Sequence, residues 1–217
     1  MKPRRQIPMA NETVSQAPIN AALEMVDMVF DLTVALVPEN YSFSLWTEIA
    51  RILPWLNEEK NAGILPLRGS ASANQILLSK RSKLILRIPV ARAAQTAQLT
   101  GKQLNIGGAN LIVGKGKERE LKPTTTLHAF MVESNLGEIE FLADMKQKLQ
   151  AMSISCNLIC DKYRKFNDAE HSLTGFGLVI HDLKPQASMQ IQCNGLGGSR
   201  RFGCGIFWPY KAITGLD

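Results

Sequence analysis

The sequence predicts an α+β protein of two consecutive β-α-β-β-α-β units, which is the arrangement of tandem ferredoxin-like (RRM-like) domains with a C-terminal glycine-rich loop. Three observations lead to this fold class. The chain has 217 residues, enough for two domains of about 100 residues each. Segments with strand composition and segments with helical spacing follow one another in the same order twice. Adjacent strand pairs in each unit break the strict alternation that one doubly wound sheet requires.

The first predicted domain covers residues 25–122 and follows a polar tail, residues 1–24, that we interpret as a flexible extension. Phe43, Trp46 and Ile49 recur at helical spacing, so we assign them to the core of an amphipathic helix and not to a base-stacking platform. The expected elements are a strand in 24–37, this helix in 42–56, a glycine-containing loop, strands at 74–79 and 83–88, a helix in 90–101 and a strand pair in 103–114.

The second predicted domain covers residues 123–217. Its expected elements are a strand in 124–132, a helix with an apolar stripe in 138–152, strands in 154–163 and 175–183, a short helix from Pro185 to about Cys193, and a last strand in 205–210. Lys162, Arg164 and Lys165 are expected in a polar loop between the two middle strands. An RNA-facing loop and a solvated one explain these three cations equally well.

Composition narrows the possible classes of protein. The chain has no apolar run of the roughly 20 residues that a membrane-spanning helix needs, and no apolar segment follows its basic N-terminus. We therefore expect a cytoplasmic protein with no membrane partner. Cys156, Cys160, Cys193 and Cys204 form no C-x-x-C pair, and no G-x-x-x-x-G-K-[ST] loop occurs, so neither a metal nor another cofactor is expected.

Basic charge is concentrated in two segments. Residues 80–122 contain ten Lys or Arg and two Glu, a net charge of +8, whereas the whole chain has +6. Residues 195–211 add three basic residues and no acid. Clustered positive charge suits a nucleic-acid backbone, because each neutralised phosphate releases condensed counterions. Lysine-rich solvated loops explain the composition about as well. Within the first segment we single out Lys80, Arg81 and Lys83, which flank a predicted strand, as RNA-binding candidates.

The most informative motif is GLGGSRRFGCGIF, residues 195–207. Glycines allow backbone amides to approach a phosphate closely, and paired arginines supply planar donors for phosphate or guanine. We therefore interpret the loop as phosphate-binding and consider glycines that merely satisfy tight turns less favoured. The dinucleotide-binding spacing is absent, because Arg200 stands three residues after Gly197. The candidate RNA-binding residues are Gly195, Gly197, Gly198, Arg200, Arg201, Gly203 and Gly205.

This loop resembles the C-terminal glycine-rich loop of the CRISPR repeat-RNA endoribonucleases, which belong to the repeat-associated (RAMP) superfamily. The family pattern G-x-G-x-x-x-x-x-G-x-G, followed by an apolar residue, is met at residues 195–206. Shorter segments, among them MVDMVFDL, VPENYSFSL and GFGLVIHDLKP, are similar to the MYXAN-type branch over roughly residues 25–211. The resemblance implies two ferredoxin-like domains, binding of a repeat-RNA hairpin, and metal-independent cleavage to a 2′,3′-cyclic phosphate and a 5′-hydroxyl. It also implies that the enzyme stays bound as a subunit of a CRISPR effector complex.

The same resemblance makes Tyr41 the candidate catalytic residue. MYXAN-type enzymes commonly carry a histidine ahead of the first helix, and this chain has Tyr41 there, in VPENYSFSL. A tyrosine with an ordinary pKa near 10 is a poor base at neutral pH. A catalytic Tyr41 therefore requires a pKa lowered by a neighbouring cation, or a role in orienting the ribose 2′-hydroxyl. An ordinary amphipathic side chain at a helix start is at least as good an interpretation.

The histidines and the other function classes complete the expectations. For His128, His171 and His181 a structural or surface role is favoured over catalysis. The alternatives to a nuclease are an RNA-hairpin-binding subunit that does not cleave, which the tyrosine substitution makes plausible, and a ferredoxin-like domain that binds small anions.

Overall fold

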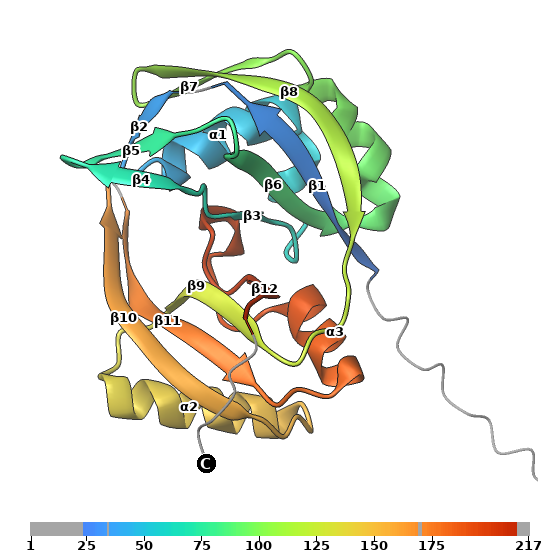
Figure 1. Ribbon diagram of the computed structural model, residues 1–217, viewed down its shortest axis with the longest axis vertical. Coiled ribbons are helices and arrows are strands. Elements are labelled where there is room, and N and C mark those ends of the chain that lie inside the picture. Colours follow the sequence, from blue (N-terminus) through green and yellow to red (C-terminus); the bar gives the residue numbers. More distant parts are fainter. Residues whose placement is uncertain (1–23, 34, 169–170, 212–217) are drawn as a thin grey trace, which may run out of the picture.

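The computed structural model describes residues 24–33, 35–168 and 171–211. Two sheet-containing halves follow each other along the long axis of the molecule (Figure 1). Apart from Glu24, the predicted N-terminal tail lies outside the described residues. Within the described part of the chain, no helix is long and apolar enough to cross a membrane.

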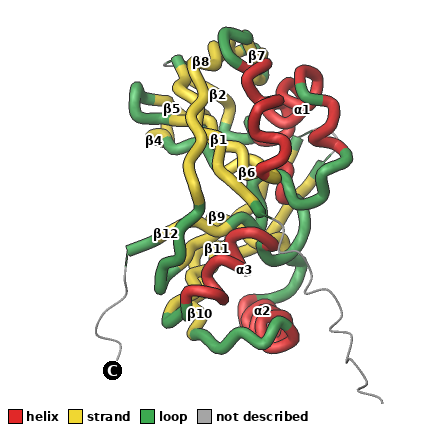
Figure 2. Tube along the Cα trace, turned by 90° about the vertical axis from the view of Figure 1, so that its right-hand side faces the viewer, coloured by secondary structure: helices red, strands yellow, loops and turns green. Residues whose placement is uncertain are grey.

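The N-terminal half is built on an antiparallel five-stranded sheet with α1 (Ser42–Ile52) on one side of it (Figure 2). Val26, Met28 and Phe30 alternate along β1 and are buried in the core that the helix covers. Without β7 (Gln103–Ile106), the strand order is 2-3-1-4, which is the order of a β-α-β-β-α-β unit. The sheet runs in the order β3 (Gly63–Leu65), β6 (Lys83–Pro89), β1 (Met25–Leu32), β8 (Ala109–Glu120) and β7 (Gln103–Ile106).

Three elements of this half differ from the prediction. The edge strand β3 occupies a segment that the sequence analysis interpreted as a loop. The strand was missed because its three residues, which begin with Gly63 and precede Pro66, are too few to show a period. The predicted strand at 74–79 forms β5 (Gln75–Leu78) of a separate three-stranded sheet with β2 (Leu36–Pro38) and β4 (Gly69–Ser72). The expected second helix, η2 (Val90–Leu99), is 3-10, and a shorter 3-10 turn, η1 (Pro54–Asn57), follows α1.

The C-terminal half repeats the order 2-3-1-4, so the predicted tandem ferredoxin-like fold class is confirmed. The apolar stripe predicted for α2 consists of Ile139, Leu142, Met145, Leu149 and Met152. Met145 and Leu149 are buried as expected, whereas Ile139 is exposed and Phe141 takes the buried position on this face. The strands run in the order β10 (Asn157–Asn167), β11 (Ser172–His181), β9 (Leu127–Glu133) and β12 (Phe207–Pro209), with α2 (Glu138–Ala151), α3 (Pro185–Asn194) and the 3-10 turn η3 (Arg200–Phe202). The segment 121–126 that connects the halves contains the predicted boundary at residues 122 and 123.

The polar loop predicted around Lys162 and Arg164 does not exist at that place. Both residues, with Lys165, lie within β10, which continues to Asn167 before the chain turns. Charged residues weakened the strand pattern in the sequence. Five consecutive residue pairs with β11, from Tyr163 to Asn167, show that this half of β10 is regular beyond the register shift between Cys160 and Tyr163.

A buried arginine joins the two halves. Arg87 of β6 is completely buried and forms a bidentate ion pair with Asp27 of β1, with N–O distances of 2.7 and 3.1 Å. Its Nη1 also donates to the backbone oxygens of Gln192, at 3.2 Å, and of Phe207. Because one guanidinium bonds to both halves, it holds the N-terminal sheet at a set position relative to α3 and β12.

Candidate functional site

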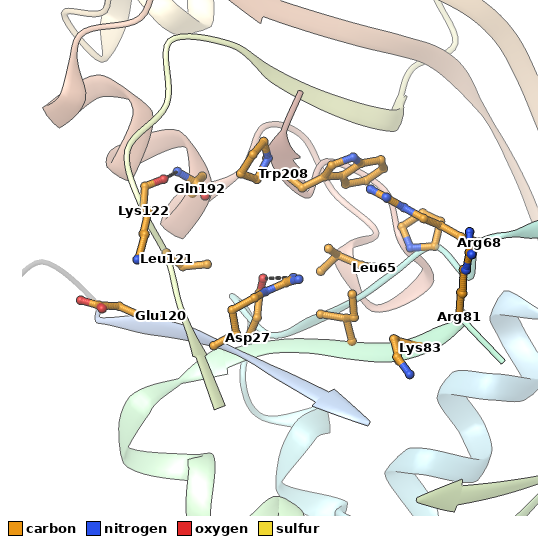
Figure 3. A pocket seen from close by; sticks show the side chains of 14 residues that line it. Asp27, Leu65, Arg68, Arg81, Lys83, Glu120, Leu121, Lys122, Gln192 and Trp208 are labelled. Carbon is orange, nitrogen blue, oxygen red and sulfur yellow. Dashed lines mark hydrogen bonds and ion pairs between the residues drawn. The ribbon is translucent and has the colours of Figure 1, made fainter. Parts of the chain in front are cut away.

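A cleft of about 570 Å³ lies between the two sheets. Three neighbouring strands of the N-terminal sheet, the end of β8 and β12 of the other half supply its walls (Figure 3). Arg81 and Lys83 lie on one side of it and Lys122 on the other, while Arg68 reaches toward Trp208. The lining includes five cationic side chains, those of Arg68, Arg81, Lys83, Arg119 and Lys122, and two carboxylates, those of Asp27 and Glu120.

The carboxylate at the floor of the cleft is already neutralised. Arg87, Asp27 and Arg119 face one another across β6, β1 and β8, because the strand register pairs Asp27 with both arginines. Arg119 donates to Asp27 Oδ2 at 2.8 Å and keeps a half-exposed side chain. Two cations therefore share one buried carboxylate, and the cleft has an excess of positive charge.

The Trp208 ring lies in the opposite wall, with two further rings packed beside it. The Arg68 guanidinium lies 5.8 Å from the centre of the Trp208 ring, and His128 meets the same indole edge-on at 5.2 Å. Tyr210 is half exposed, with its ring 5.1 Å from His128. Burial lowers the pKa of His128, and the nearby Asp161 carboxylate opposes this effect. An indole beside cations is a surface on which a base can stack while its phosphates are neutralised.

The structure separates the three cations that the sequence grouped on the flank of β6. Arg81 and Lys83 line the cleft. Lys83 is also held by Asp31, with Nζ 2.5 Å from Oδ1. Lys80 is exposed but does not line the cleft.

Three of the five glycines in the 195–205 loop use their backbone N–H groups for hydrogen bonds within the protein. The N–H groups of Gly195, Gly203 and Gly205 donate to the carbonyls of Ile191, Arg200 and Met131. The phosphate cradle expected from these three amides is therefore wrong, because their hydrogen bonds are made within the chain. Gly197 and Gly198 remain exposed, and their part in RNA binding stays a prediction.

The two arginines of the loop have different environments. Arg200 is buried, near Arg87, and the burial lowers its pKa to about 10. It points into the protein, so the expectation that both arginines face a ligand is wrong for Arg200. Arg201 is exposed and lies over the ring of Phe202, 4.7 Å from its centre. A contact between Arg201 and RNA stays a prediction.

Tyr41 lies at the start of α1 as predicted, but it is buried. Its hydroxyl accepts a hydrogen bond from the Leu67 N–H at 2.7 Å. Burial raises the pKa of Tyr41 to about 12, so the lowered pKa expected from a neighbouring cation is wrong. A catalytic role for Tyr41 stays a prediction. With this pKa, Tyr41 is protonated at neutral pH and could act only as a hydrogen-bond partner or proton donor.

Sequence reasoning placed His171 among structural or surface residues, whereas the structure places it beside this helix start. The end of β10 reaches the segment that precedes α1, where Asn40 Nδ2 donates to the backbone oxygen of Asn167 at 3.0 Å. The His171 imidazole stacks on Phe43, with ring centres 5.0 Å apart, and lies 5.9 Å from Phe202 of the glycine-rich loop. The residue type was the sequence feature that could have singled out His171. The two aromatic rings that it contacts are more than 30 residues away in the sequence.

The described part of the chain contains no cluster of metal ligands. Within the described ranges, no three His, Cys, Asp or Glu side chains lie close enough together to hold a metal ion.

Two ferredoxin-like sheets on either side of a basic cleft, with a glycine-rich loop before the last strand, define a tandem ferredoxin-like protein of the RAMP class. The family model described as Cas6 Crispr matches residues 26–212. The chain therefore belongs to the Cas6 family.

Individual relatives agree with this assignment. The CRISPR-associated endonuclease Cas6 of Myxococcus xanthus (strain DK1622) is 30% identical over 186 residues, which are 85% of this chain and 81% of that protein. A solved structure described as CRISPR associated protein Cas6 superposes with a TM-score of 0.61 at 12% identity, covering 87% of this chain and 100% of the other. A structure described as a RAMP protein binding different RNA substrates has a TM-score of 0.61 at 13% identity, with coverages of 84% and 98%. At these identities the two structures show the shared fold.

Proposed function

We propose that this protein is an endoribonuclease that processes CRISPR precursor RNA by binding the repeat hairpin and cleaving within the repeat. The observation that carries the proposal is the basic cleft with an indole wall, found in a chain of the Cas6 family. The Myxococcus xanthus relative bears the name of an endonuclease, and one solved relative of the same fold is described as binding RNA substrates.

The cleft offers both kinds of contact that a single-stranded RNA segment needs. Arg81 and Lys83 on one side and Arg119 and Lys122 on the other bind phosphates, while a base stacks on Trp208. Lys80 extends the basic surface beyond the cleft, and Arg201, with Gly197 and Gly198, extends it at the glycine-rich loop.

Cleavage proceeds without a metal ion and leaves a 2′,3′-cyclic phosphate and a 5′-hydroxyl. The nucleophile is the ribose 2′-hydroxyl of the RNA itself, so the protein needs to supply a proton acceptor, charge stabilisation and an in-line geometry. The protein then stays on its product in the cytoplasm as a subunit of an effector complex.

A labelled repeat hairpin tests the proposal. We expect tight binding of the hairpin, weaker binding of a scrambled unstructured RNA, and one discrete product in the presence of EDTA. Equal affinity for the two RNAs contradicts repeat recognition. Cleavage that stops in EDTA and returns with added magnesium contradicts the metal-free reaction.

The second candidate is an RNA-binding subunit that does not cleave. The burial and raised pKa of Tyr41 favour it, because the residue at the position of the family histidine is not an effective base. This candidate predicts a shifted but intact hairpin in the same assay, with the cleft contacts unchanged.

A further inference from the structure

The start of α1, the glycine-rich loop and the end of β10 meet at one place. A small cavity of about 80 Å³ lies there, and its lining includes Glu39, Tyr41, Phe166 of β10 and Phe202 of the loop. His171 lies near this cavity through Phe202, which lines it and whose ring centre is 5.9 Å from that of the imidazole. Because Tyr41 stays protonated, His171 is the side chain at this place whose type most often serves as a general acid or base.

The geometry points to His171, oriented by Asp168, as the proton-transfer residue of the RNA cleavage. This inference rests on the proposed function and names the residue that replaces the family histidine. It comes from the opposite half of the molecule, at the end of a strand pair and not at the start of α1.

Asp168 sets the orientation of the ring. Its carboxylate oxygens lie 3.1 and 3.2 Å from His171 Nδ1, and Oδ1 accepts the His171 backbone N–H at 2.6 Å. A carboxylate at Nδ1 keeps the proton on that nitrogen and leaves Nε2 as the basic atom. The imidazole is 45% exposed, so Nε2 can reach a bound RNA.

The surroundings supply the rest of the chemistry. Stacking on Phe43 places the ring at the first turn of α1, where the helix dipole favours negative charge. The Arg201 guanidinium lies against Phe202, the same ring that His171 contacts, and it is the nearby cation for the phosphate oxygens. The charged groups at this place include Asp168 beside His171, Arg201 against Phe202 and Glu39 in the lining of the cavity.

The reaction balances with these groups and water. His171 Nε2 takes the proton of the 2′-hydroxyl, the 2′ oxygen forms a bond to phosphorus, and the bond from phosphorus to the 5′ oxygen breaks. The 5′ oxygen takes a proton from water, and His171 returns its proton to solvent. The products are the cyclic phosphate and the 5′-hydroxyl of the proposed function.

Single-turnover cleavage of a repeat hairpin in EDTA tests the inference. His171→Asn keeps a polar side chain of similar size but cannot exchange protons, so we expect the rate to fall about 10²–10⁴-fold with RNA affinity unchanged. His171→Ala should recover activity with added imidazole. Asp168→Asn should lower the rate less than His171→Asn and shift the pH profile of cleavage.

His181 provides a matched control. It sits at the other end of the same strand pair, opposite Asn157, and also pairs with a carboxylate, Asp182, at 2.8 Å. His181→Gln should cleave at the wild-type rate, and circular dichroism should show all variants folded. Wild-type cleavage together with full activity of His171→Asn overturns the inference while the nuclease function stands. A wild-type protein that binds the hairpin and never cleaves it overturns both.

Discussion

The Tyr41 hydroxyl makes one buried hydrogen bond, and the ring around it is packed in the N-terminal core. Tyr41→Phe keeps the ring and leaves the Leu67 N–H without its acceptor. We expect a loss of about 1–3 kcal/mol in the free energy of unfolding, because a buried donor is left unpaired, and a cleavage rate close to wild type. Urea denaturation and single-turnover kinetics measure the two effects. A rate lowered about 10²–10⁴-fold at unchanged stability would instead make Tyr41 the catalytic residue.

Within the glycine-rich loop, Gly205 is the position that backbone geometry restricts most clearly. Its φ is +63°, and an added Cβ would lie 2.1 Å from the Leu196 carbonyl oxygen. Gly205→Ala should therefore cost about 1–3 kcal/mol of stability, since alanine is strained there and the backbone must move.

Gly198 is the matched position in the same loop. An added Cβ there meets only the end of the flexible Glu133 side chain, at 3.1 Å. Gly198→Ala should change the thermal midpoint little, as expected of a surface substitution within about 0.5 kcal/mol. Equal destabilisation by the two alanines would contradict the packing role of Gly205.

For the molecule as a whole, Arg87 determines how the two halves are held. Arg87→Met removes the bond to Asp27 and the donors to Gln192 and Phe207. Leaving buried acceptors and a buried carboxylate with fewer partners should cost about 3–5 kcal/mol, measured by denaturant unfolding. RNA affinity should fall as well, because the cleft walls lose their common anchor.

Arg119 bonds to the same carboxylate from a half-exposed position and serves as the control. Arg119→Met should cost clearly less than Arg87→Met, because Asp27 keeps its bidentate partner Arg87 and the lost donor is half exposed. It should also reduce the salt dependence of RNA binding by about one phosphate contact. Arg87→Met with the small cost expected of Arg119→Met would show that the buried arginine does not join the halves.

Local patterns were sufficient for most of the element order of the two halves. The apolar spacing of Phe43, Trp46 and Ile49 predicted α1, the stripe of α2 was equally clear, and the order of strands and helices implied the tandem fold. These features depend on neighbours within a few residues, which periodicity records. Short or charged strands escaped: β3 has three residues, and the far half of β10 contains Lys162, Arg164 and Lys165.

The candidate site depended on contacts between distant segments. The glycines and arginines of residues 195–205 were recognisable as a motif. The structure shows that Arg200 is buried whereas Arg201 is exposed, and that three of the glycine amides form hydrogen bonds within the chain. His171 meets Phe43, 128 positions earlier in the chain, and Arg87 meets Phe207 across 120 residues. Residue type and spacing show which groups can do chemistry. Which of them are exposed, and which lie together, follows from the packing of the two halves, because that packing assigns each side chain to the core or to the cleft.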